Sequence, residues 1–379
     1  MQKVKVKDIC KIYNGYSFKS DNYVESGIRI IRIANVQKGF IEDSAPVFYP
    51  ENTDGIEKYL LNEGDLLLSL TGNVGRVALL EKKMLPAALN QRVACLRLKN
   101  DIVDKEFLFH FFNSSLFENQ CIQNANGVAQ KNLSTRWLYE YEIPLYPKGE
   151  QHRIVEVLNR IRTIILYKNT ELNKLDNLIK SRFVEMFDDC SEIKAIGEVV
   201  SICRGASPRP IQKYITNDDN GINWIKIGDV SDDSLYITET VERITKEGAE
   251  KSREVNKGDF ILSNSMSYGR PYILRINGCV HDGWLILSDF SQSFNELYLY
   301  YALRSEYVQH QFEEKVDGAV VKNLNSNLVK ETLIKIPSMN EQNQFSLFAK
   351  QIDKLKVEVQ KSLDKTQMLF DSLMQEYFG

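Results

Sequence analysis

The chain carries much of its sequence twice, with the second copy about 191 residues after the first. Residues 126–133 match residues 317–324 in a glycine and in the Lys-Asn-Leu triplet that closes each segment. Residues 62–76 match residues 256–270 in a Gly-Asp pair, an apolar run that ends in serine, and a closing Gly-Arg pair. A period this long exceeds the roughly 20 to 50 residues of a solenoid unit, so each copy must be domain-sized. The duplication predicts a pseudo-two-fold molecule whose target has two similar but unequal parts.

Each half changes character once, from short strands and turns to one long helix. Residues 28–33, 65–70 and 93–98 are apolar runs punctuated by Gly, Asn and Asp, which is typical of strands joined by turns. A helix over residues 107–121, repeated at 297–312, is expected to pack on the sheet of each half. The pattern predicts an α+β fold with two β-rich domains, each followed by a long helix.

The last part of each half has the apolar period of a coiled coil. Alternating steps of four and three residues place apolar side chains at eight of ten positions in both halves. The apolar seam positions are Ile154, Leu158, Ile161, Ile165, Leu172, Leu175, Ile179 and Met186 in the first half, and Phe345, Ala349, Ile352, Val359, Leu363, Phe370, Leu373 and Tyr377 in the second. A period of 3.5 residues over nearly five heptads is what two long helices need to pack along a shared seam.

The length of the helical segments favours pairing between them. A helix over residues 150–188 would extend about 58 Å at 1.5 Å per residue, which is more than the diameter of a small domain. We therefore expect the two helices to form an antiparallel coiled coil. Lys168 and Lys356 are polar positions in the two seams, which either fix the register or mark where a partner enters.

The expected division has four segments. They are a first β-rich domain at 1–148, a first spacer helix at 149–190, a second β-rich domain at 191–338 and a second spacer helix at 339–379.

Composition limits the classes of protein that remain. The six cysteines are scattered without a Cys-x-x-Cys pair and the chain has four histidines, so a zinc site is not expected. No signal segment and no run of about 18 apolar residues occurs, which predicts a cytoplasmic protein without a membrane partner. The net charge of -3 gives no general support for DNA binding, so any DNA affinity must come from local clusters or a basic partner.

No catalytic motif accompanies the duplication. The sequence lacks a phosphate-binding loop, a dinucleotide-binding glycine motif, His-Glu-x-x-His and Gly-x-Ser-x-Gly. It also lacks the Asn/Asp-Pro-Pro-aromatic tetrad that amino-methyltransferases use. We therefore expect no catalytic residue and no cofactor on this chain.

Each half instead repeats a polar turn after a buried strand, with further polar residues expected beside it. Hydroxyl, amide and guanidinium groups of this kind read base edges and phosphates, although they also occur in ordinary surface turns. The candidate DNA-binding residues are Ser69, Thr71, Asn73, Arg76, Asn90, Gln91, Arg92, Lys131 and Asn132 in the first half, and Ser263, Asn264, Ser265, Ser267, Tyr268, Arg270, His281, Trp284, Lys322 and Asn323 in the second. The halves keep the turn frame and change its side chains, which suggests two readers of different short sequences.

With these motifs in order, the chain resembles the specificity subunits of type I restriction-modification systems. The resemblance lies in residues 64–69 with Gly75-Arg76, in 131–133, in 143–145, in Glu150-Gln151 and in 181–187, all of which recur in the second half. It covers essentially the whole chain, and the order and duplication of the motifs make it specific. The second half departs from the first at Pro271, where the first has Val77, so residue-by-residue transfer is in doubt around 264–284.

The resemblance implies that two target recognition domains read a bipartite, asymmetric double-stranded DNA target, with the helices as a ruler for the gap. It implies two modification subunits as partners, which would bring S-adenosylmethionine and methylate adenine. Restriction subunits would join through them and bring ATP and Mg. The chain itself would be a non-catalytic specificity subunit.

Three alternatives remain open. A coiled-coil scaffold that does not bind DNA would share the duplication, and salt-dependent binding to duplex DNA would exclude it. A specificity chain for a methyltransferase without a restriction partner would differ in what it co-purifies with. An enzyme with an unrecognised site would show activity as a purified single chain.

Overall fold

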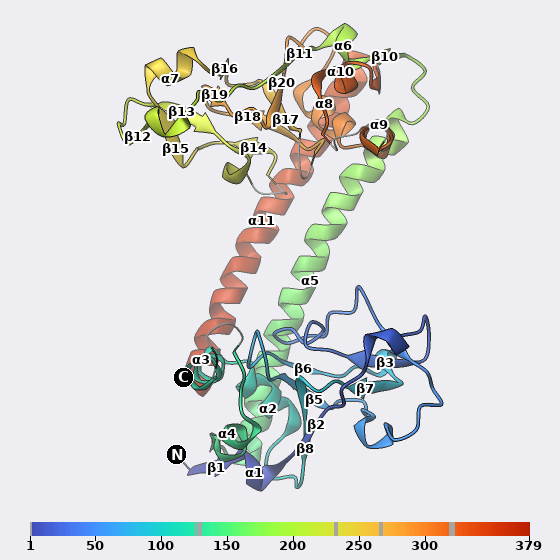
Figure 1. Ribbon diagram of the computed structural model, residues 1–379, viewed down its shortest axis with the longest axis vertical. Helices are drawn as coiled ribbons and strands as arrows, with labels where there is room; N and C mark the ends of the chain where they lie inside the picture. Colours follow the sequence, from blue (N-terminus) through green and yellow to red (C-terminus); the bar gives the residue numbers. More distant parts are fainter. Residues whose placement is uncertain (1, 126, 128–130, 231–233, 265–267, 318–322) are drawn as a thin grey trace. The chain divides into compact units, whose positions relative to one another are not determined.

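The computed structural model describes residues 2–125, 127, 131–230, 234–264, 268–317 and 323–379. The chain divides into two compact units, of which unit 1 comprises Met1–Asn169 with Gln360–Gly379 and unit 2 comprises Thr170–Val359. Two long helices, α5 (Lys148–Phe187) and α11 (Met339–Phe378), contribute to both units (Figure 1).

Unit 1 is built on an antiparallel sheet of four strands in the order β2-β8-β5-β6. A second sheet has the order β4-β3-β7, with β3 parallel to β7, and β1 pairs with β9. The strands are β1 (Gln2–Lys5), β2 (Cys10–Asn14), β3 (Ile28–Ile31), β4 (Phe48–Tyr49), β5 (Leu66–Ser69), β6 (Val77–Leu79), β7 (Ala87–Leu89), β8 (Val93–Leu98) and β9 (Glu142–Leu145). The helices besides α5 are α1 (Val6–Ile9), α2 (Lys105–Phe112), α3 (Ser115–Asn124) and α4 (Thr135–Glu140).

Unit 2 repeats this topology with extra strands. Its sheets have the orders β11-β20-β17-β18-β14 and β12-β15-β13-β19-β16, and β10 pairs with β21. The strands are β10 (Ile193–Ala195), β11 (Ser201–Arg204), β12 (Ile215–Thr216), β13 (Ile222–Ile225), β14 (Tyr236–Ile237), β15 (Glu242–Ile244), β16 (Arg253–Val255), β17 (Phe260–Ser263), β18 (Pro271–Leu274), β19 (Gly278–Val280), β20 (Trp284–Ser288) and β21 (Leu333–Lys335). The helices besides α11 are α6 (Ile196–Val199), α7 (Lys246–Glu250), α8 (Glu296–Leu303), α9 (Glu306–Asp317) and α10 (Ser326–Lys330). The four-strand core β11-β20-β17-β18 corresponds to β2-β8-β5-β6, so the predicted duplication and the α+β fold class are confirmed.

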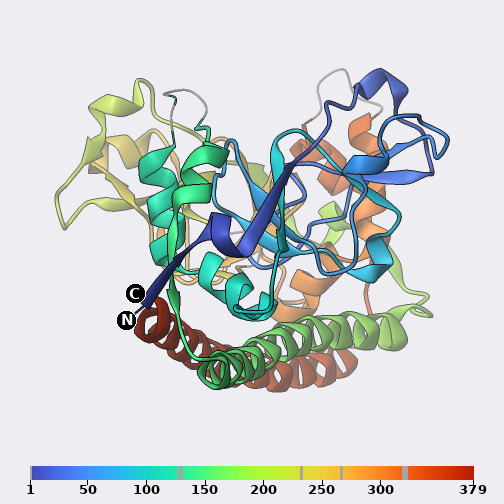
Figure 2. The same ribbon diagram turned by 90° about the horizontal axis from the view of Figure 1, so that it is seen from below.

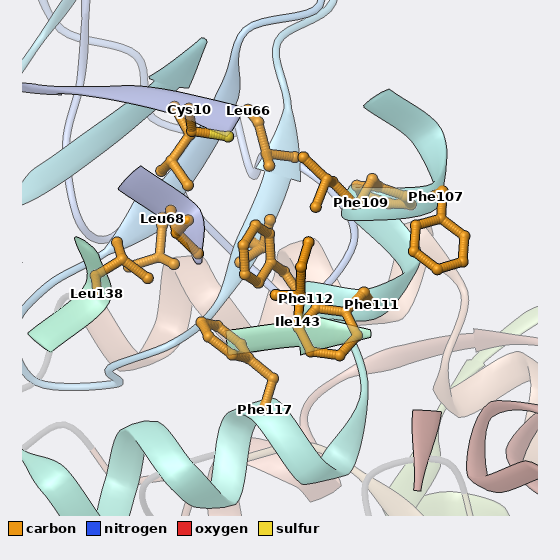
Figure 3. Close-up of a cluster of buried hydrophobic side chains, with 14 of the residues drawn as sticks. Cys10, Leu66, Leu68, Phe107, Phe109, Phe111, Phe112, Phe117, Leu138 and Ile143 are labelled. Atoms are coloured by element: carbon orange, nitrogen blue, oxygen red, sulfur yellow. The ribbon is translucent and has the colours of Figure 1, made fainter. Parts of the chain in front are cut away.

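Aromatic side chains from the helices fill the core between helix and sheet in unit 1. Phe111 and Phe112 of α2 and Phe117 of α3 are fully buried and lie around Ile143 of β9 (Figure 3). The rings of Phe112 and Phe117 have centroids 4.6 Å apart, within the range of favourable aromatic contacts. Burying several such rings on one face explains why α2 and α3 lie against the sheet.

The single helix expected over residues 107–121 is wrong in detail, because two helices meet there. Helix α2 ends at Phe112, and Ser114 begins α3 by accepting a hydrogen bond from the amide of Phe117 at 3.2 Å. A serine hydroxyl that caps a new helix competes with continuation of the old one. The counterpart over 297–312 breaks in the same way between α8 and α9 beside Ser305, which accepts from the amide of Val308 at 3.4 Å.

The repeated Glu-Gln pair of the sequence marks a buried clamp at the start of each long helix. In unit 1 the Gln151 side chain accepts from the amide of Asp104 at 2.7 Å and donates to two backbone carbonyls, those of Ile102 and Tyr146. In unit 2 Gln342 accepts from the amide of Asn295 at 2.8 Å and donates to the carbonyls of two further residues in the same pattern. Asp104 and Asn295 are the N-caps of α2 and α8, so each glutamine ties a cap to the first turn of a long helix.

The seam positions of α5 and α11 are all buried or half-buried. Within unit 1 the first turns of α5 share a core with the last turns of α11, and the hydroxyl of Tyr146 donates to the carbonyl of Tyr377 at 2.8 Å. Within unit 2 the last turns of α5 pack on the first turns of α11, where Phe183 and Phe187 contact Phe345. The helices therefore run antiparallel, side by side in each unit (Figure 1, Figure 2).

The polar seam residue of unit 2 is paired rather than open. Lys356 lies 2.5 Å from a carboxylate oxygen of Asp176 on the facing helix. Helices α5 and α11 begin within one residue of the expected spacer starts at 149 and 339, while the division into four domains stays a prediction because both compact units include parts of both helices.

Two features limit other kinds of site. Within the described ranges, no helix is long and apolar enough to cross a bilayer, and no three His, Cys, Asp or Glu side chains gather in a way that could hold a metal ion. Cys10, Cys95, Cys121 and Cys279 are buried, and burial raises the pKa of the Cys10 thiol to about 12. These four thiols are packing groups.

Candidate nucleic-acid interface

The polar turn of unit 1 joins β5 to β6 and is closed by a buried serine. The Ser69 hydroxyl donates to the carbonyl of Asn73 at 2.5 Å and accepts from the amide of Arg76 at 3.0 Å. Gly75 has a positive φ of 82°, and a Cβ there would come within 2.8 Å of the Cβ of Cys121 on α3. Only glycine fits this approach without a shift. Ser69 therefore shapes the turn, and it is fully buried.

Three segments that are distant in sequence meet at this turn, as the sequence predicted. The amide of Leu70 donates to the carbonyl of Arg92 at 3.0 Å, and the amide of Gly72 donates to the carbonyl of Lys131 at 2.9 Å. The amide of Leu133 also donates to the carbonyl of Leu70 at 2.7 Å. The exposed side chains around this point are Asn73, Gln91, Arg92, Lys131 and Asn132, with Thr71, Arg76 and Asn90 half-buried beside them. We call this group the first loop cluster.

The unit 2 turn between β17 and β18 has the same frame. Ser263 is buried and accepts from the amide of Arg270 at 3.1 Å, and the amide of Gly269 donates to the carbonyl of Ser263 at 2.8 Å. The amide of Asn264 donates to the carbonyl of Gly283 at 3.1 Å, and the amide of Leu324 donates to the carbonyl of Asn264 at 2.9 Å. The second loop cluster therefore brings together Asn264, residues 281–283 and Leu324, as the first brings together their counterparts.

The predicted residues of the second loop cluster differ widely in exposure. Asn323 is exposed, and His281, Tyr268 and Arg270 are half-buried. Ser265, Ser267 and Lys322 lie outside the described residues.

Four predicted DNA contacts are buried and need correction. Trp284 is 0% exposed in the core under β20, and Ser69, Ser263 and Asn264 are also buried. Trp284 follows the turn in sequence, but it begins β20, a strand that is buried on both faces, and its side chain packs in a core with Ile225 and Ile286. No DNA contact is proposed for these four residues, which hold the loops in place.

A segment that the sequence reasoning missed lies against the first loop cluster. Arg76 donates from Nη1 to the side-chain oxygen of Gln37, whose amide nitrogen donates to the carbonyl of Ala34 at 2.8 Å. Asn35 closes the same turn by accepting from the amide of Arg32 at 2.9 Å. The signal for it was the match of residues 32–36 with 226–230, where Asp229 accepts from the amide of Lys226 at 2.7 Å.

A second missed feature is a glycine in each half that lets two segments touch. A Cβ on Gly15 would come within 2.2 Å of the carbonyl group of Asn90, and one on Gly205 within 2.2 Å of the carbonyl oxygen of His281. The amide next to each glycine, of Tyr16 and of Ala206, donates to the strand before the turn. Because the backbones touch, residues 14–19 and 204–209 border the two loop clusters.

The side chains of residues 204–209 surround one acid in the second loop cluster. Asp282 accepts from the hydroxyl of Ser207 at 2.8 Å and lies 3.3 Å from a guanidinium nitrogen of Arg209. Its backbone carbonyl accepts from Nε of Arg204 at 2.9 Å. Burial works to raise the pKa of Asp282, but the Ser207 hydrogen bond and the neighbouring His281 lower it more, so this pKa lies below the ordinary value.

The buried histidine of unit 1 is a structural group. Burial lowers the pKa of His110 to about 4, against a hydrogen bond with Asn159 at 2.8 Å that favours the charged ring. It lies among the phenylalanines of α2, and the centroid of its ring is 5.3 Å from that of Phe109.

Fold and site together define a duplicated α+β protein that carries two matched polar loop clusters and, in the described residues, no metal centre. The family model for the type I restriction modification DNA specificity domain matches residues 1–177 and again residues 189–366. The chain therefore belongs to the family of type I restriction-modification specificity subunits, as the sequence predicted. Such subunits are non-catalytic components of an enzyme complex, so the prediction of a non-catalytic chain is confirmed by membership.

Relatives by sequence agree with this assignment. The chain is 31% identical to the type I restriction enzyme MjaVIII specificity subunit of Methanocaldococcus jannaschii over 47% of this chain and 43% of that protein. It is 33% identical to the EcoAI specificity subunit of Escherichia coli over 45% of this chain and 31% of that one. These two matches span less than half of each relative, whereas the EcoBI specificity subunit of Escherichia coli aligns at 24% identity over 99% of this chain and 85% of its own length.

Solved structures show the same fold. The S subunit of a type I restriction-modification system from M. genitalium aligns over 100% of this chain and 96% of its own, with a TM-score of 0.57 at 15% identity. A chain solved for complex assembly and conformational transition of the type I R-M system aligns over 100% and 97%, with a TM-score of 0.61 at 18% identity.

Proposed function

We propose that the chain reads a bipartite, asymmetric double-stranded DNA target, with each loop cluster contacting one half-site. One comparison between the two loop clusters carries this proposal. Their backbone hydrogen bonds match, whereas their exposed side chains differ. A constant frame with variable tips suits two readers of different sequences. Guanidinium and amide groups of the kinds found here bond guanine and adenine edges, and lysine contacts phosphates.

We further propose that α5 and α11 set the gap between the half-sites. Each helix has 40 residues and would be about 60 Å long at 1.5 Å per residue. A continuous coiled coil resists bending, so its length would fix the spacing that the two readers accept.

The chain would also assemble the enzyme that acts on this target. We propose two modification subunits as direct partners, which bring S-adenosylmethionine and methylate adenine, and restriction subunits that join through them with ATP and Mg. Exposed apolar side chains on the two helices support a docking role, since such side chains are costly to leave in water. They include Leu166, Tyr167, Leu347 and Met368, each more than half exposed. The complex would act on DNA in the cytoplasm.

The test is selection from a randomised duplex library with the chain co-expressed with its modification subunit. Two short enriched blocks separated by a fixed random gap are expected. A single block, or no enrichment, would contradict the two-reader proposal and leave a scaffold that does not read DNA. Co-purification then separates a restriction-modification complex from a methyltransferase that lacks a restriction partner.

A further inference from the structure

The second loop cluster has an acid where the first has an uncharged amide. The amide of His281 donates to the carbonyl of Ile225 at 3.1 Å, as that of Asn90 donates to Ile31 at 3.2 Å. These matched bonds align Asp282 with Gln91 and Gly283 with Arg92.

This alignment removes a cation from the second turn and adds a negative charge. In unit 1 Gln91 and Arg92 are exposed, and in the described part of the chain no hydrogen bond or ion pair holds either side chain. A guanidinium in that position can bind phosphate or guanine. In unit 2 the corresponding turn offers Asp282 and Gly283, and a free carboxylate would repel the DNA backbone.

Both carboxylate oxygens of Asp282 have partners within the protein. Oδ1 accepts from the Ser207 hydroxyl at 2.8 Å and lies 3.1 Å from Nε2 of His281, and Oδ2 lies 3.3 Å from Nη2 of Arg209. A carboxylate can read cytosine only with a free acceptor oxygen facing the base. Asp282 therefore serves to organise its neighbours, and its backbone carbonyl does the same for Arg204 and Asn264.

The two arginines keep most of their donors available. The Arg209 side chain is 82% exposed and contacts Asp282 through one nitrogen. Arg204 is exposed and donates to the protein through Nε. Each guanidinium has five N–H donors in a fixed fork, so each retains donors for a phosphate or a guanine edge. The first unit has Asn14 and Lys19 at the matching positions.

We propose that Arg204 and Arg209 supply the cationic DNA contact of the second loop cluster, in the role that Arg92 fills in the first, and that Asp282 is the positioning residue that presents them. The proposal rests on the two-reader function and names the residues of the second reader. In the second loop cluster the DNA-binding cations therefore lie on residues 204–209, which Gly205 allows to approach the turn at 281–283, and not on that turn itself.

The first experiment measures binding of the assembled complex with its modification subunits to three duplexes. One has both half-sites, and each of the others has one half-site scrambled. The double variant Arg204→Ala/Arg209→Ala should lose about tenfold or more in affinity for the intact target, and scrambling the second half-site should then cost little more. Each lost phosphate contact should lower the salt dependence of binding by about one unit of slope. Arg243→Ala, which removes a half-buried arginine of unit 2 paired with Asp219, is the matched control and should leave the preference for the second half-site unchanged.

Asp282→Asn separates positioning from simple charge. Removing a negative charge near DNA should tighten binding if only electrostatics acts. A positioning residue predicts the opposite, with weaker discrimination at the second half-site and an unchanged first half-site. Ser207→Ala, which keeps the charge and removes the two hydrogen bonds between Ser207 and Asp282, should show the same change to a smaller degree.

The outcomes are distinguishable. If the wild-type complex prefers neither half-site, the proposed function fails. If the wild type reads both and the double arginine variant keeps its second-half preference, the inference is overturned while the function stands. If Asp282→Asn tightens binding and keeps discrimination, the positioning role is overturned.

Discussion

The two loop clusters share a frame and differ in how their polar tips are held. In the first loop cluster, Arg76 donates a hydrogen bond to Gln37, and the side chains of Gln91 and Arg92 on the neighbouring turn are exposed. In the second loop cluster, Asp282 of the equivalent turn contacts side chains of residues 204–209 through its carboxylate and its backbone carbonyl. The shared part is made of backbone hydrogen bonds, and the divergent part is made of side chains. The difference teaches that one frame can present its cations from either of two neighbouring segments.

The largest effect should come from changing how far apart the two readers are held. Deleting residues 165–171 together with 361–367 removes one heptad from each helix, and Ile165 and Gln367 line one pocket, so the two deletions face each other. Seven residues correspond to about 10 Å of helix, or up to about 3 base pairs of duplex. Binding to the original target should fall about 100-fold or more, because both readers can no longer engage at once.

Selection from the library should then give the same two blocks with a shorter gap. A heptad deleted from α5 alone is the control, since it breaks the seam register instead. An unchanged gap in the double deletion would rule out the ruler.

A second effect tests whether the buried glutamine clamps at the starts of α5 and α11 are equivalent in the two units. Gln151→Ala and Gln342→Ala each remove three hydrogen bonds from a buried amide and leave backbone groups without partners. Each should cost about 3 kcal/mol of unfolding free energy in its own unit. Urea unfolding followed by hydrogen exchange would locate the loss, with Thr163→Ala and Lys354→Ala, at exposed positions of the same two helices, as matched controls. If either substitution lowered the unfolding free energy of both units, the stabilities of the two units would be coupled.

A third effect concerns the arginine that both turns share. Arg76→Ala and Arg270→Ala should each weaken binding by about 1 to 3 kcal/mol and relax a different half-site. Gln37→Ala should relax the same half-site as Arg76→Ala to a smaller degree, because it removes a support of the guanidinium. Half-site preferences of the three variants can be read from library selection. If Arg76→Ala and Arg270→Ala altered the same block, the two loop clusters would not be independent readers of different half-sites.

The smallest effect is a difference in acid sensitivity. Burial lowers the folded-state pKa of His110 to about 4, below the ordinary value near 6.5, although the hydrogen bond to the side-chain oxygen of Asn159 and the charge of Glu106 oppose burial while Arg162 reinforces it. Between these values the unfolded chain binds more protons, so stability is lost as pH falls from about 6.5 toward 4. The expected loss is about 1 kcal/mol between pH 7 and 5.5.

The loss should be confined to unit 1. Tyr301 occupies the matching position in unit 2, where burial raises its pKa, and it stays neutral throughout this range. Unfolding curves at several pH values, with His110→Phe as the control, provide the measurement. Equal acid sensitivity in wild type and His110→Phe would assign the effect elsewhere.

Much of the fold could be predicted from periodicity, because an internal repeat and a heptad pattern can both be recognised from the order of residues alone. The duplication, the seam positions and the meeting of residues 69–76, 90–92 and 131–133 were all predictable from pattern. The break at Ser114 was not, because a hydroxyl that caps one helix looks the same in sequence as one inside a longer helix. The burial of Trp284 was likewise hidden, since it depends on the packing that covers both faces of β20.

The side-chain contacts of the loops were the least predictable part. Gln37 and Asp282 act through contacts between segments, and the sequence pattern assigns neither of them a role. The repeat did contain a signal for the segment at 32–36, in its match with 226–230, and an exhaustive comparison of the halves finds it.

The buried serine of each turn has a consequence for how such a protein changes over generations. Because the hydroxyl of Ser69 bonds backbone groups of residues 73 and 76, closure of the turn does not depend on the side chains at 71 and 73. Those positions can be replaced without reopening the turn, so new preferences can arise by single substitutions on a working scaffold. A mutational library confined to these positions should therefore contain a high proportion of folded proteins, and it is the economical place to look for altered targets.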